Sequence, residues 1–90
     1  MDVHLIVKLK SSYEAWYELF SNDAENRSKM CDENLTLVGK ANDATALVTL
    51  FNVDMEAMGA MMEDSEFKKL TEEFVTEHIA YSITHLASPE

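Results

Sequence analysis

Three histidines, His4, His78 and His85, are the residues of this chain best suited to metal binding or proton transfer. No two of them stand four residues apart on a predicted helix, and no Cys/His spacing matches a zinc site. We therefore predict no metal site and favour a structural or solvated role for all three. His4 is the best catalytic candidate, because it faces the open side of the predicted sheet. His78 is expected at the junction between a helix and the last strand.

A group of aromatic residues could line a pocket for a small molecule. Tyr13, Trp16 and Tyr17 follow one another at helical spacing, and together with His85 they are the candidates for ligand binding. Aromatic residues at this spacing more often belong to the hydrophobic core. The spacing therefore predicts that Trp16 is buried against a sheet, with ligand contact as the alternative.

Sulfur-containing and basic side chains could also contribute to a site. Four methionines between Met55 and Met62 could make an adaptable binding surface, but their helical spacing favours packing on the sheet. Cys31 lies near Lys29 but also next to acidic residues, so we expect no reactive thiol. Arg27 is expected to be a surface ion-pair partner.

Composition excludes several classes of partner. A glycine-rich phosphate loop, a nucleophile elbow and a carboxylate-rich metal loop are all missing from the sequence, so no cofactor is expected. Seventeen acidic residues against seven basic ones give a formal charge of −10, which makes nucleic acids and anionic membranes poor partners. The apolar runs fall far short of the ~20 residues that cross a membrane, and the N-terminus has no signal-like pattern. The expectation is a cytoplasmic protein.

The spacing of apolar residues predicts the elements that position these side chains. Apolar residues alternate with others in the strands and recur at helical spacing in the helices. The predicted strands are Val3–Lys10, Leu35–Ala41, Ala44–Val53 and His78–Leu86. The predicted helices are Tyr13–Ala24 and Met55–Phe74.

Local residue types predict where these elements begin and break. A capping box that starts at Ser11 opens the first helix, and Asp54 caps the second. Breaks are expected at Asn22–Asp23 in the first helix and near Asp64 in the second. Asn42–Asp43 tolerates the positive φ of a tight hairpin.

The order strand, helix, strand, strand, helix, strand is the split β-α-β arrangement, an α+β fold of the ferredoxin-like type. Ninety residues form a single domain, 1–90. Right-handed crossovers set the sheet order as 4-1-3-2, antiparallel, with both helices on one face. The other face of the sheet carries His4, Ile6 and Lys8 on strand one and further large apolar residues on strand three. Such a patch is unusual on a monomer, so it predicts a homodimer built sheet to sheet.

Two parts of the chain carry a family resemblance. They are the run 10–20 with Arg27 seven residues on, and the run 51–57 followed by 65–70. The first is similar to the first helix, and the second to the third strand and second helix, of small dimeric α/β-barrel proteins. These proteins are related to the antibiotic-biosynthesis monooxygenases.

The resemblance implies a dimeric α/β barrel, in which two four-stranded sheets face each other and any active site lies between a sheet and its helices or loops. Members include cofactor-independent monooxygenases, lactone isomerases, haem-degrading enzymes and proteins without an assigned activity. One hypothesis is a small-molecule binding module. The alternative is a cofactor-independent monooxygenase or isomerase acting on a small aromatic or polyketide-like compound. An enclosed apolar pocket that holds His4 or a tyrosine hydroxyl would favour the enzyme, whereas a filled core would favour a structural role.

Overall fold

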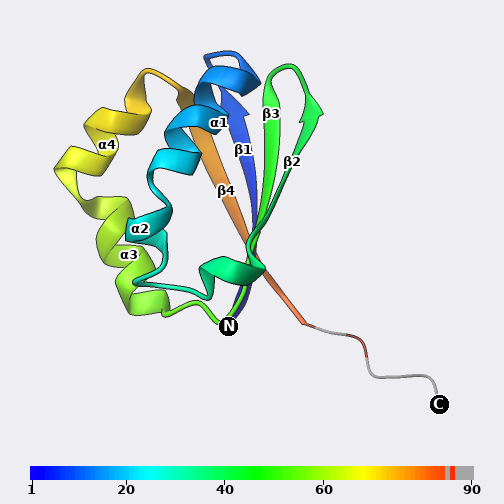
Figure 1. The fold of residues 1–90 in the computed structure, drawn as a ribbon, viewed down its shortest axis with the longest axis vertical. Helices are drawn as coiled ribbons and strands as arrows, with labels where there is room; N and C mark the ends of the chain where they lie inside the picture. Colours follow the sequence, from blue (N-terminus) through cyan, green and yellow to red (C-terminus); the bar gives the residue numbers. More distant parts are fainter. Residues whose placement is uncertain (85, 87–90) are drawn as a thin grey trace.

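The computed structural model of this chain describes residues 1–84 and 86, which form one sheet covered by helices (Figure 1). The strands are β1 (Asp2–Leu9), β2 (Leu37–Asn42), β3 (Thr45–Leu50) and β4 (Val75–Ile83). The helices are α1 (Tyr13–Asn22), α2 (Ala24–Arg27), the 3-10 turn η1 (Glu33–Leu35), α3 (Met55–Glu63) and α4 (Ser65–Glu72).

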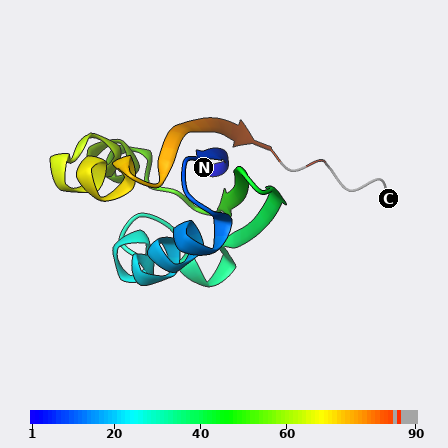
Figure 2. The ribbon, with the colours of Figure 1, turned by 90° about the horizontal axis from the view of Figure 1, so that it is seen from above.

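The sheet has the predicted order and direction. Its strands run β2-β3-β1-β4, and every neighbouring pair is antiparallel. In the centre of the sheet, Ile6 of β1 lies opposite Leu47 of β3 on one side and Ile79 of β4 on the other. The helices form two groups, α1 with α2 and α3 with α4, that cover the same face of the sheet (Figure 2). The ferredoxin-like α+β fold is confirmed.

Both predicted helices break where expected, and an aspartate stands at each break. Asp23 separates α1 from α2, and Asp64 separates α3 from α4. The Asp64 carboxylate caps α4 by accepting from the Phe67 amide at 3.2 Å. Asp54 caps α3 as predicted. The first cap differs from the prediction by one residue: Ser12 caps α1 by accepting from the Ala15 amide.

Strand boundaries differ from the prediction by one to three residues. Leu35 belongs to η1, so β2 begins at Leu37. The hairpin turn after Asn42 has no positive φ among its residues, and the Asn42 side chain accepts from the Ala44 amide at 2.9 Å. The positive φ falls instead at Asn52, which has φ 55° and follows the early end of β3 at Leu50.

The last strand begins three residues earlier than predicted. β4 starts at Val75 and ends at Ile83, so His78 lies inside the strand and not at its junction with the helix. Its partner across the sheet is Val7, whose side chain is 1% exposed on the helix-covered face. The register with Val7 therefore places His78 on the helix-covered face.

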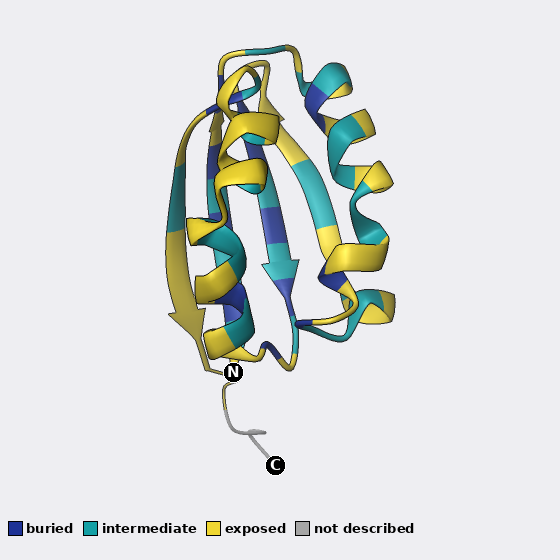
Figure 3. Cartoon of the chain, turned by 90° about the vertical axis from the view of Figure 1, so that its left-hand side faces the viewer, coloured by how far each residue is buried: buried dark blue, intermediate teal, exposed yellow. Residues whose placement is uncertain are grey.

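The core lies between the sheet and the helices. Alternate residues of β1 and β3 are almost fully buried there, including Val3, Val7, Val48 and Leu50. Buried and less buried positions alternate along the central strands (Figure 3). Because side chains alternate between the two faces of a strand, each central strand turns one apolar face toward the helices. The alternation in Val3–Lys10 predicts this arrangement for β1.

The opposite face of the sheet carries several apolar side chains that no described helix covers. Leu37, Tyr81 and Ile83 are 61%, 50% and 37% exposed, and the register places them on the same side as Ile6 and Leu47. Within the part of the chain that the structure describes, no helix is long and apolar enough to cross a membrane.

Candidate functional site

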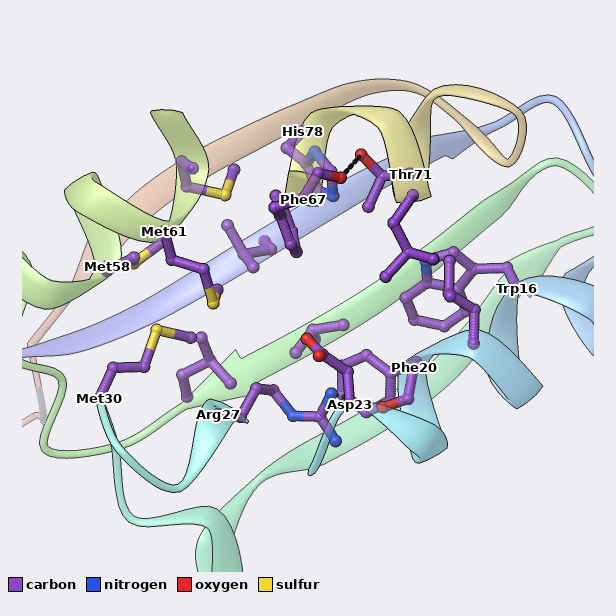
Figure 4. A pocket seen from close by; sticks show the side chains of 16 residues that line it. Trp16, Phe20, Asp23, Arg27, Met30, Met58, Met61, Phe67, Thr71 and His78 are labelled. Carbon is purple, nitrogen blue, oxygen red and sulfur yellow. Dashed lines mark hydrogen bonds between the residues drawn. The ribbon is translucent and has the colours of Figure 1, made fainter. Parts of the chain in front are cut away.

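An apolar cavity of about 70 Å³ lies between the sheet and the two helix groups (Figure 4). A water molecule needs about 10–15 Å³ on this measure, so the cavity has room for a small organic group. Its wall includes Trp16, Phe20, Met58, Met61, Phe67 and His78. The core is therefore not completely filled on the side where the helices meet the sheet.

The two helix groups supply opposite walls of this cavity. Trp16 and Phe20 come from α1, with ring centroids 5.0 Å apart. Met58 and Met61 come from α3, where their spacing of three places them on neighbouring positions of one helical face. Methionine side chains adapt readily to a partner's shape, so this wall can adjust to a bound molecule.

His78 places an imidazole on the wall of this apolar space. Its ring centroid lies 6.4 Å from that of Phe67, and its nitrogens make no hydrogen bond with any residue in 1–84 or with 86. Burial lowers the pKa of His78 below 6.5. The imidazole is therefore neutral at pH 7 and keeps both a donor and an acceptor for a bound molecule.

The other polar side chains of the wall are already engaged. Thr71 donates from its hydroxyl to the Phe67 carbonyl at 3.0 Å. Asp23 accepts from the Asn26 amide group at 2.8 Å. Arg27, discussed next, is held by a carboxylate and a backbone carbonyl. His78 is therefore the lining group best placed to bond with a ligand.

Arg27 is buried, which corrects the prediction of a surface ion pair. It is 5% exposed and donates to both carboxylate oxygens of Glu33, at 2.8 and 3.1 Å. It also donates to the Phe20 carbonyl at 2.5 Å, and its guanidinium lies 3.5 Å from the centre of the Phe20 ring. Its charge is thus compensated inside the protein, and a ligand anion would have to compete with Glu33.

The predicted ligand-binding aromatics separate into two groups. Trp16 is 4% exposed and lines the cavity, so it is both buried, as predicted, and placed to contact a ligand. Tyr13 and Tyr17 stack on each other at 5.8 Å outside the cavity wall. Burial raises the pKa of Tyr13, with a further contribution from Tyr17. Neither tyrosine hydroxyl is part of the pocket, which was one of the features expected of an enzyme.

His4 lies on the open face of the sheet, as predicted, and not in the cavity. Its Nδ1 is 3.0 Å from the Thr49 hydroxyl, and it faces Tyr81 on β4. Its catalytic role stays a prediction. His85 falls outside the described residues, and its proposed ligand contact stays a prediction too.

Sequence reasoning missed His78 as a residue of the cavity. The strand was predicted to begin at His78, at its junction with the helix, so no face of the sheet was predicted for this residue. Extending the strand back to Val75 places Val75, His78 and Ala80 on the helix-covered side, after the irregularity that the register has near Leu9. Among residues 1–84 and 86, no cluster of three or more histidine, cysteine or acidic side chains could hold a metal ion.

A comparison with solved structures identifies a similar fold. No protein-family model matches the chain, and no curated protein matches it either. SnoaB, a cofactor-independent oxygenase from Streptomyces nogalater, is similar over 99% of this chain and 98% of its own, with 12% sequence identity and a TM-score of 0.56. This likeness confirms the ferredoxin-like α+β fold of the single chain.

Proposed function

We propose that this protein binds a small apolar compound in the cavity between its sheet and its helices. The observation that carries the proposal is the cavity itself, with Trp16 on one side and the unbonded imidazole of His78 on another. Binding sites are typically apolar spaces with a few well-placed polar groups. The apolar wall would supply affinity, and His78 would orient the ligand.

Calorimetric titration with toluene tests the binding proposal. The wild type should bind this probe, because the cavity wall is largely apolar and its methionine side chains can adjust to make room for a ring. Val48→Leu adds volume inside the cavity and should weaken binding. Val38→Leu is the matched control, because Val38 lies directly opposite Val48 in the register but does not line the cavity. Equal weakening by both substitutions would refute the cavity as the site.

A second candidate function is oxygenase or isomerase chemistry on a small aromatic or polyketide-like compound. The neutral imidazole of His78 in an apolar space favours it, because such a group can take a proton from a substrate. The structural neighbour SnoaB is a cofactor-independent oxygenase. Without a cofactor, the substrate supplies the electrons: an activated CH2 group and O2 would yield C=O and water.

Oxygen consumption with an aromatic compound that bears an activated CH2 group tests the enzymatic proposal. His78→Gln should abolish the uptake while keeping a polar side chain in the cavity. His4→Gln tests the earlier candidate on the open face in the same assay. If oxygen uptake survives His78→Gln but is lost in His4→Gln, the catalytic base is His4. If the wild type itself consumes no oxygen, the proposed reaction is rejected.

We further propose that two copies associate through the open sheet face. The support is the exposed apolar surface of that face, together with the family resemblance. Pairing the same face about a two-fold axis covers both copies at once.

A further inference from the structure

A second hollow lies directly outside the cavity, between α2 and the helices α3 and α4. This groove has a volume of about 560 Å³. Its floor is apolar and includes Met30, Ala60, Met61, Phe67 and Leu70. Leu70 is 47% exposed there. The groove is therefore large enough for a substituent that the cavity cannot hold.

The groove and the cavity share part of their walls. Met30, Met61, Phe67 and Leu70 line both spaces, as does Asp23. Two of these four apolar side chains are methionines, which change shape at little cost. The boundary between the cavity and the groove is thus formed in part by flexible side chains, Met30 and Met61.

The rim of the groove is negatively charged. Asp23, Asp64 and Glu66 line it, against the single amine of Lys29. Two of these carboxylates are held in place, since Asp64 caps α4 and Asp23 accepts from Asn26. The whole chain carries a charge of −10, so its field also disfavours an anion at this mouth. A positively charged group complements the rim.

We propose that the cavity and the groove form one site with two compartments, whose ligand places an apolar ring in the cavity and an amine-bearing chain in the groove. This inference rests on the proposed binding function and names the class of ligand. The ring would lie among Trp16, Met58 and Phe67, beside His78. The chain would cross between Met30 and Phe67, and its ammonium group would lie near Asp23 and Asp64.

Titration with three matched probes tests this assignment. Toluene supplies the ring alone, 3-phenylpropylamine adds the chain and the positive charge, and 3-phenylpropanoate adds a similar chain with a negative charge. The amine should bind at least about tenfold more tightly than toluene, because each buried CH2 group contributes about 0.8 kcal/mol and tenfold corresponds to about 1.4 kcal/mol. It should also bind more tightly than the carboxylate, with a preference that shrinks as salt is added.

A substitution in the groove separates the two compartments. Ala60 lines the groove but not the cavity, so Ala60→Phe should remove the advantage of the amine and leave toluene affinity unchanged. Ala44→Phe, at the exposed hairpin between β2 and β3, is the matched control and should change neither. Trp16 is the single tryptophan of the chain and is present in both variants. Its fluorescence therefore checks that each variant keeps its fold.

The outcomes distinguish this inference from the binding proposal beneath it. Toluene binding without any advantage for the amine, or an equal affinity for the carboxylate, would overturn the two-compartment site and leave the cavity as a binding site. An advantage that survives Ala60→Phe would also overturn it. Failure of all three probes to bind would overturn both proposals.

Discussion

Arg27 and Glu33 form an ion pair with two hydrogen bonds, of 2.8 and 3.1 Å, in which the arginine side chain is only 6% exposed. The pair joins α2 to η1 and so fixes the segment that leads from the helices into β2. It also brings the guanidinium against the Phe20 ring at the cavity wall. The geometry of the cavity therefore depends on this pair.

Breaking that pair should destabilise the fold. Glu33→Leu leaves the Arg27 charge buried without its carboxylate, and we expect a loss of about 3 kcal/mol in the free energy of unfolding, at the low end for a buried pair. The low end applies because the Glu33 side chain is 25% exposed. Glu14→Leu is the control, since that carboxylate lies 3.7 Å from Lys40 in an exposed pair, and it should have a far smaller effect. Equal losses in urea unfolding would contradict this account.

Trp16 should contribute strongly to stability. Trp16→Ala removes a large buried ring and should lower the free energy of unfolding by about 3–5 kcal/mol. Tyr17→Ala, one residue along the same helix but 43% exposed, should cost clearly less. A loss below about 1 kcal/mol for Trp16→Ala in chemical denaturation would mean that the ring does not hold the core together.

His78 should make stability depend on pH. Because its folded pKa lies below 6.5, the unfolded chain binds a proton at a pH where the folded chain does not. Stability is therefore complete above about pH 6.5 and falls as the pH drops toward the lower folded pKa. Unfolding curves measured across this range should show a steeper loss for the wild type than for His78→Gln. Parallel curves for the two proteins would contradict the burial of the imidazole.

The open face of the sheet should determine the assembly. Sedimentation of the wild type at micromolar concentration is expected to give a dimer, which tightens with added salt because each chain carries a charge of −10. Leu47→Glu places a charge at the centre of that face and should yield monomers. Met55→Glu, on an exposed position of α3, should leave the dimer intact. A wild-type monomer of 10.2 kDa would reject the sheet-to-sheet dimer.

Most of the fold could be predicted from the sequence, because periodicity reports directly on burial. The alternation in Val3–Lys10 determined the two faces of β1, and that strand contacts both of its neighbours. Strand ends were less accurate, since the start of β4 depends on a register irregularity near Leu9 that no local pattern marks.

The candidate site was predicted only in part. Trp16 was identified, because its position on the apolar stripe requires it to face the sheet. Arg27 and His78 were not, since their burial depends on contacts with Glu33 and Phe67 that form only when separate elements pack. The cavity itself has no signature in the sequence, because it arises from imperfect filling between two helix groups.

Nuclear Overhauser contacts between bound toluene and the protein test the central claim most directly. If the ligand site is the cavity, toluene protons should give contacts to the Trp16 ring and to the methyl groups of Met58 and Met61, and the Trp16 indole N–H resonance should shift with the titration. Contacts confined to the methyl groups of Ile6 and Leu47, on the open face of the sheet, would contradict a binding site between the sheet and the helices.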